Sequence, residues 1–252
     1  MAAEGQGIDA LGQFKLHPAL GVLGESVNFT QSNLMMVVAG LLILALLYIG
    51  MKPRAMVPGR LQAAAEMGYE TIMNMCTETI GGHEGRKYFP FVFTLFFFIL
   101  FGNLLGVFPY FFTFNSHIMV TLALSLLVFV LVTVVGLKEH GLHWFGYFVP
   151  AGVPKALLPL MVVIELISYF SRIISLSVRL FANMMAGHVM LEVFGSFIVM
   201  LAGIGFLGYF PAALSLGVNT ALIGFELLVA TLQAYVFAVL TCIYLHDAVH
   251  LH

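Results

Sequence analysis

Long, uninterrupted apolar runs constrain this chain more than any other feature of its sequence. The first run, residues 34–51, contains no charged residue, and at ~1.5 Å per residue a helix of that length matches the thickness of a bilayer. The whole chain is 61% hydrophobic and only 9% charged. Soluble domains carry about 25% charged residues, so a soluble fold of this composition could not cover its surface. We therefore expect an all-α polytopic membrane protein.

The apolar runs divide the chain into an N-terminal segment, residues 1–33, and a single membrane domain, residues 34–252. One stretch of that domain is too polar to span. Over residues 57–87, polar side chains recur every four positions between apolar ones, which is typical of an amphipathic surface helix. Its polar face is acidic, which favours a protein partner over anionic lipid. The expected helices cover residues 34–51, 57–87, 89–112, 118–137, 157–201 and 210–247.

The last two runs, 157–201 and 210–247, are too long for a perpendicular crossing. The first would measure ~65 Å as one helix, against a hydrocarbon thickness of ~30 Å. Either each run breaks into two spans, or each forms one steeply tilted helix. Because no turn signal divides them cleanly, we favour two tilted helices packed as a hairpin, which gives five membrane crossings.

Basic residues outside the apolar runs predict the orientation. Two loops that are separated by two expected spans contain most of the Lys and Arg residues, namely Lys52, Arg54, Arg60, Arg86, Lys87, Lys138 and Lys155. By the positive-inside rule, both loops are cytoplasmic. We therefore expect segment 1–33 and the N-terminus outside, and the C-terminus in the cytoplasm.

Ionisable residues inside the last two runs are the strongest functional signal. A charged residue at the bilayer centre costs ~2.5–3.5 kcal/mol on insertion scales, so such residues indicate function by default. The polar side chains concerned are Glu165, Arg172, Arg179, His188, Glu192, Glu226 and Gln233. Arg179 is the hardest to explain structurally, because a buried arginine stays charged and no acid lies within seven residues of it. It needs an anion or a wet cavity beside it.

Helical spacing separates these residues into two tracks. Glu165, Arg172 and Arg179 are each seven residues apart and line one stripe of a helix. His188 lies ~180° around the helix from Arg179, and Glu192 follows one turn later on nearly the same face. Two polar tracks at opposite ends of one helix indicate two half-pathways for an ion, with Arg179 near their junction.

Structural roles are the alternatives for most of these residues. Arg172 could pair with Glu165, or it could reach the cytoplasmic interface through its long stem. His188 could be a hydrogen-bonded core histidine, and Glu192 could lie at the outer interface. Gln233 could make an interhelical hydrogen bond.

Other classes of function have less support. A secondary transporter that binds an anion at Arg179 is the main alternative, although transporters usually contain internal repeats and none is evident here. An intramembrane enzyme is disfavoured because no HExxH or GxSxG motif occurs, and without a Walker-type loop we expect no directly bound nucleotide. A net charge of −2 without a basic patch argues against nucleic acid. We expect no cofactor and no metal, with the tail histidines solvated and Cys76 and Cys242 as reduced structural thiols.

Several segments resemble subunit a of the F-type ATP synthase. Residues 175–188, SLSVRLFANMMAGH, closely resemble the family's signature. Residues 230–237, ATLQAYVF, resemble the last-helix signature, and Gly102-Asn103 with Pro109 resembles the third-helix pattern. Residues 120–123 match the fourth helix. The resemblance covers about residues 34–247.

This resemblance implies a role as the stator half of a proton channel. The two tilted helices would face a rotating ring of c subunits, each with a membrane-buried carboxylate, and peripheral-stalk b-type subunits and the lipid bilayer would be further partners. Arg179 matches the family's essential arginine, and Asn183 and Gln233 match its polar partners. The other expected path residues are His188, Glu226, Asn103 and His117 on the outer side, and Glu165 and Ser168 on the cytoplasmic side. The chain would not be an enzyme by itself.

The implied mechanism passes a proton to a ring carboxylate by way of Glu226 and His188 and releases it near Glu165. Arg179 would keep the two half-channels apart, so that proton flow drives ring rotation and ATP synthesis elsewhere in the complex. His188 and Glu226 occur in the exchanged order that mitochondrial members have. The compact length nevertheless indicates a bacterial cell inner membrane rather than a mitochondrial one. Whether the ion is H⁺ or Na⁺ depends mainly on the ring.

Overall fold

The computed structural model describes residues 30–51, 59–107, 113–141, 157–203 and 208–250, together with Trp144, Gly146, Val149 and Gly205. Several residues used in the predictions lie outside this described part, namely most of segment 1–33, Lys52, Arg54, Pro109, Lys155 and His252. The elements found in it are α1 (Gln31–Met51), α2 (Arg60–Thr79), α3 (Gly82–Val107), the 3₁₀ helix η2 (Phe114–Ser116), α4 (Ile118–His140), α5 (Leu158–Ala202) and α6 (Tyr209–Val249). All but α2 and η2 are long and apolar enough to cross a membrane. The predicted fold class is therefore confirmed.

The surface helix predicted over residues 57–87 is wrong from residue 80 onward. In the structure α2 ends at Thr79, and α3 already begins at Gly82. Gly81 between them has φ 121°, a left-handed conformation that favours glycine and ends a helix. The polar residues that follow, including Arg86 and Lys87, therefore form the first turns of the next membrane helix instead of the end of the surface helix.

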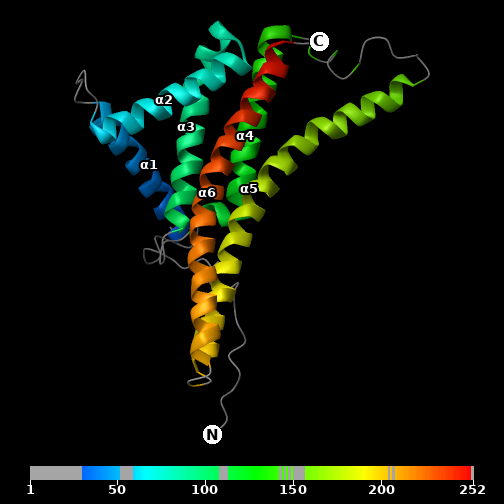
Figure 1. Cartoon of the computed structure of the whole chain (residues 1–252). Helices are drawn as coiled ribbons and strands as arrows, with labels where there is room; N and C mark the ends of the chain where they lie inside the picture. The colour runs from blue at the N-terminus through cyan, green and yellow to red at the C-terminus, as the bar shows by residue number, and fades with distance from the viewer. Residues whose placement is uncertain are drawn as a thin grey trace, which may run out of the picture.

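The long helices α5 and α6 form an antiparallel hairpin that extends beyond the lower ends of α3 and α4 (Figure 1). Neither helix is broken: α5 runs for 45 residues and α6 for 41 residues. In its first half α5 leans away from the other helices, whereas its second half lies beside α6 (Figure 1). Helix α2 lies across the upper end of the bundle and packs on α3 and α1.

The core lies where α6 meets α3 and α2. Small residues recur every fourth position on α6 and are all fully buried, namely Ala230, Ala234, Ala238 and Cys242. Such a row lets helix backbones approach closely, which is how membrane helices gain packing energy without a hydrophobic driving force. On α3 the rings of Phe89, Phe93 and Phe97 follow one another with centroids 5.2 and 4.6 Å apart. These rings fill the space between α3 and α2.

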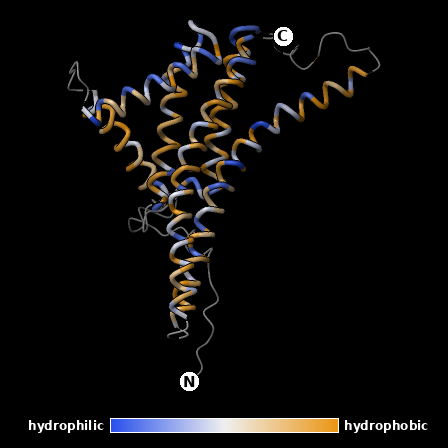
Figure 2. The backbone as a smooth tube through the Cα atoms, in the orientation of Figure 1, coloured by the Kyte–Doolittle hydropathy of each residue, from blue (hydrophilic) through white to orange (hydrophobic). Residues whose placement is uncertain are grey.

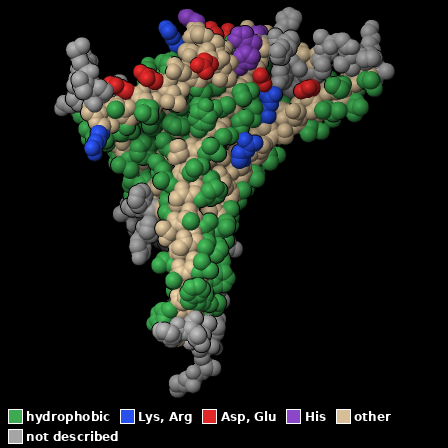
Figure 3. Space-filling model, in the orientation of Figure 1, with side chains coloured by type: hydrophobic (Ala, Val, Ile, Leu, Met, Phe, Trp, Pro, Cys, Tyr) green, Lys and Arg blue, Asp and Glu red, His purple; other side chains and the backbone are tan. Residues whose placement is uncertain are grey.

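The outer surface has the pattern expected of a protein in lipid. Hydrophilic residues collect in α2 and at the upper ends of α4 and α6, while single hydrophilic positions interrupt α5 (Figure 2). Hydrophobic side chains cover most of the visible face below the charged upper edge (Figure 3). Large apolar side chains are exposed there, such as Val199 at 76% and Phe210 at 83%. Hydrocarbon can solvate such side chains, whereas water would not.

The two cysteines offer a test of the packing between α2 and α6. Cys76 and Cys242 are both free thiols, and their Sγ atoms lie 3.7 Å apart. A disulfide requires an S–S distance of about 2.05 Å, so a small local movement suffices to form one. We expect a membrane-permeant oxidant to cross-link them within one chain, as measured by mass spectrometry of disulfide-linked peptides. Cys242→Ser is the control, and failure of the folded protein to cross-link would contradict this packing.

Candidate functional site

Arg179 lies on an exposed face of α5, near the middle of the helix. Its neighbours Leu176 and Leu180 are buried, so the arginine points away from the interior of the chain. The ion pairs of α5 with α6 are Arg172 with Asp247 and His188 with Glu226. Within the described residues, no carboxylate forms an ion pair with Arg179. The guanidinium is therefore open to a partner that is not part of this chain.

The register of the hairpin explains why Arg179 has no acid opposite it. Asn183 Nδ2 donates a hydrogen bond to Gln233 Oε1 at 3.3 Å, which fixes where the antiparallel helices face each other. Arg179 lies one turn before Asn183 on α5. Because the two helices are antiparallel, the residue of α6 that faces Arg179 lies one turn after Gln233, at Phe237. Between Glu226 and Asp247, the sequence of α6 contains no acidic residue. The predicted partners Asn183 and Gln233 thus contact each other beside Arg179 rather than neutralise it.

The predicted outer pair is brought together by the close approach of α5 and α6. His188 Nδ1 lies 3.6 Å from Glu226 Oε1, and the Glu226 side chain is only 4% exposed. Neither carboxylate oxygen accepts a hydrogen bond from the described residues. At Gly187 a side chain would come within 2.8 Å of Glu226 Oε1, so glycine there leaves room for the carboxylate. A buried carboxyl beside an imidazole is an arrangement that can exchange a proton.

Of the other outer residues expected, Asn103 has a supporting position, because it contacts α6 one turn after Glu226. Asn103 is fully buried, donates from Nδ2 to the Ala230 carbonyl oxygen at 3.1 Å, and accepts at Oδ1 from Asn115 at 2.6 Å. It therefore ties α3 to α6 and to η2. His117 precedes α4, and burial lowers the pKa of its imidazole, so it is neutral near pH 7.

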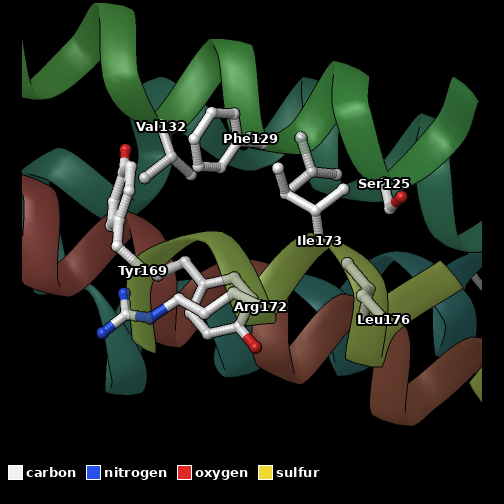
Figure 4. A pocket seen from close by; sticks show the side chains of 9 residues that line it. Ser125, Phe129, Val132, Tyr169, Arg172, Ile173 and Leu176 are labelled. Carbon is white, nitrogen blue, oxygen red and sulfur yellow. The ribbon is translucent and has the colours of Figure 1, made fainter. Parts of the chain in front are cut away.

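At the other end of the hairpin, Arg172 has a partner that the sequence analysis did not consider. Arg172 Nη1 lies 3.3 Å from Asp247 Oδ2, and its guanidinium lies 5.0 Å from the centroid of the Tyr244 ring. Figure 4 shows Tyr169 and Arg172 of α5 bordering a small pocket, whose lining also includes Phe129 of α4. The signal that could have revealed this pair is the hairpin register, because Asp247 is the only acid in the last turns of α6.

Glu165 and Ser168 lie on the first half of α5, which leans away from the bundle. Glu165 is half-buried and Ser168 is exposed. Among the described residues Glu165 makes no ion pair, so its predicted pairing with Arg172 is not found. The ionisable residues of the hairpin thus lie at its two ends, with Arg179 between them. Glu192 follows His188 by one turn and is half-buried.

Comparison with known proteins identifies close relatives over the whole chain. The sequence model of the family ATP synthase A chain matches residues 33–246. ATP synthase subunit a of Granulibacter bethesdensis is 63% identical over 253 residues, which is 100% of both chains. ATP synthase subunit a of Gluconacetobacter diazotrophicus is 62% identical over 98% of this chain and 99% of its own. The protein of the same name from Acidiphilium cryptum is 55% identical over 99% and 100%.

The supporting role of Asn103 can be tested by its removal. Asn103→Ala removes the second hydrogen bond to the Ala230 carbonyl and leaves the buried Asn115 amide without its acceptor, which costs about 1–3 kcal/mol. We expect a lower thermal unfolding midpoint and less protein in the membrane. Asn74→Ala is the matched control, because Asn74 is exposed on α2 and should leave both unchanged. Equal stability of the two variants would contradict the assignment.

Proposed function

The chain belongs to the ATP synthase A chain family, and on this premise we propose that Arg179 divides two half-channels that carry protons to and from carboxylates on a rotating ring of c subunits. Family membership makes the chain a multi-pass membrane component of the Fo sector of a rotary ATP synthase. The half-channels, the residues in them and the subunits they contact are our proposal.

The observation that carries this proposal is the exposed, unneutralised guanidinium of Arg179. An arginine stays charged in any protein, and a charge at the bilayer centre is costly unless an anion accompanies it. The register of α5 and α6 leaves no acid of this chain beside it among the described residues. A carboxylate on a neighbouring subunit supplies the missing charge, and a ring of such carboxylates supplies it repeatedly.

On the outer side, the proton passes by way of Glu226 and His188 to the ring. Their contact across α5 and α6, 3.6 Å between Nδ1 and Oε1, supports this step. Once protonated, the ring carboxyl is neutral and enters the lipid cheaply, whereas the ionised form could not. Ring rotation therefore follows protonation.

On the cytoplasmic side, the ring carboxyl loses its proton near Glu165 and Ser168. Both residues lie on the part of α5 that leans away from this chain's own helices, which supports a groove shared with another subunit. The fixed cation of Arg179 then holds the new carboxylate and repels a hydronium that would otherwise cross directly. One charge that falls through 100 mV releases ~2.3 kcal/mol, so several protons per turn can drive ATP synthesis.

The basic residues predict that the two ends of the chain lie on opposite sides of the membrane, as an odd number of crossings requires, and five helices are long and apolar enough to cross. The N-terminus lies outside the bacterial inner membrane and the C-terminus lies in the cytoplasm.

The acidic residues Glu66, Glu70 and Glu78 of α2 are exposed, which supports a contact with a peripheral-stalk b-type subunit. The transporter alternative expects an enclosed anion site at Arg179, and the exposure of Arg179 does not favour it.

Removal of the arginine tests the proposal most directly. Arg179→Ala should lower ATP-driven proton pumping by inverted vesicles roughly 100-fold or more, because the proposed ring carboxylate would lose its counter-charge within the membrane, a loss of about 3–5 kcal/mol for a desolvated ion pair. Arg179→Lys should also fail, because an ammonium does not reproduce the planar guanidinium. Arg86→Ala, an exposed arginine at the start of α3, is the control. Normal pumping by Arg179→Ala would rule the scheme out.

The outer pair makes a separate prediction about coupling. His188→Ala and Glu226→Gln should each lower pumping by about 100-fold, a typical effect of losing a proton-transfer group. If both act in one path, the double variant should be no worse than the poorer single variant. Glu70→Gln on α2 should pump normally. Fully multiplicative losses in the double variant would show that the two residues act independently.

A further inference from the structure

Thr113 contacts the outer pair, although no feature of the sequence singled it out. It lies just before η2 and is 5% exposed. Its Oγ1 lies 2.7 Å from Nε2 of His188, a short hydrogen-bond distance, while Nδ1 of the same ring faces Glu226. The imidazole therefore has a hydroxyl at hydrogen-bond distance from one nitrogen and a carboxyl 3.6 Å from the other.

The threonine is itself fixed by buried contacts. Its carbonyl oxygen accepts hydrogen bonds from Ser116 Oγ at 2.6 Å and from the Ser116 backbone N–H at 3.2 Å. The same short helix is anchored by Asn115, which donates to Asn103 on α3. Opposite the hydroxyl stands Gly106, where an added side chain would overlap Thr113 Oγ1. The position of the hydroxyl is thus set by α3 and η2, not by the helices that hold the pair.

We propose that Thr113 is a positioning residue for His188. The Thr113 hydroxyl keeps the imidazole ring oriented so that Nδ1 faces Glu226. The inference rests on the proposed function of that pair. A hydroxyl both donates and accepts, so it can bond Nε2 whether that nitrogen is protonated or not. The ring therefore keeps one orientation while a proton moves between Nδ1 and the carboxyl.

A matched pair of variants separates the effect of the Thr113 hydroxyl from the effect of the side chain's shape. Thr113→Val keeps the shape and removes the hydroxyl, whereas Thr113→Ser keeps the hydroxyl. We measure ATP-driven proton pumping by inverted vesicles that contain the complete complex, per amount of assembled complex. We expect Thr113→Val to pump about 5- to 10-fold more slowly, and Thr113→Ser to pump like the wild type. If Thr113→Val does not assemble, Thr113→Ala compared with Thr113→Ser makes the same test.

Two controls distinguish positioning from general packing. Thr121→Val removes another buried threonine hydroxyl that bonds α5, at Ser177 Oγ, 3.1 Å away, and it should pump normally. In a His188→Ala background, Thr113→Val should have no further effect, because its action passes through the ring.

The inference is overturned if Thr113→Val pumps like the wild type, if Thr113→Ser is as slow as Thr113→Val, or if Thr113→Val slows the His188→Ala protein further. Arg179→Ala, measured alongside, keeps the two proposals apart. If Arg179→Ala is inactive and Thr113→Val is normal, only the role of Thr113 fails. If Arg179→Ala pumps normally, the proposed function itself fails.

Discussion

A fixed positive charge without an internal partner is the constraint on which the rest of this structure depends. The α5–α6 hairpin contains two ion pairs on either side of Arg179, namely Arg172 with Asp247 and His188 with Glu226. Between these pairs α6 has no acidic residue, so Arg179 stays unpaired and exposed within the described chain. A structural arginine in lipid would be matched with an acid on a neighbouring helix, as Arg172 is. The arrangement fits a cation that must meet a succession of passing anions.

The remaining helices hold this hairpin in register. The row of small residues on α6 lets α3 approach closely, and Asn103 then reaches the Ala230 carbonyl across the contact. Through Asn115 the same side chain fixes η2, and Thr113, whose hydroxyl contacts His188, directly precedes this short helix. Buried hydrogen bonds of this kind are specific because each partner is costly to leave unmade. A rigid side of the bundle thus fixes the geometry of a site whose other side, in the proposed function, meets a moving subunit.

Sequence reasoning predicted the features that depend on one helix at a time. Apolar runs predict the five crossings, and the spacing from Glu165 to His188 puts ionisable residues at both ends of α5, because helical periodicity is a local property. The break at Gly81 was missed, because polar residues continue across it. Asp247 and Thr113 were missed for another reason: their roles depend on the register between helices and on a short turn. Neither leaves a periodic signal in the sequence.

The first half of α5, which leans away from the bundle, has a consequence for biogenesis. A newly inserted copy presents that arm, the half-buried carboxyl of Glu165 and the exposed guanidinium of Arg179 to its surroundings. Hydrocarbon solvates such groups poorly, so the solitary chain is the least favourable state on its route into the complex. In the proposed assembly, ring carboxylates would relieve that cost, so the residues proposed to carry the ion would also favour assembly over the orphan subunit.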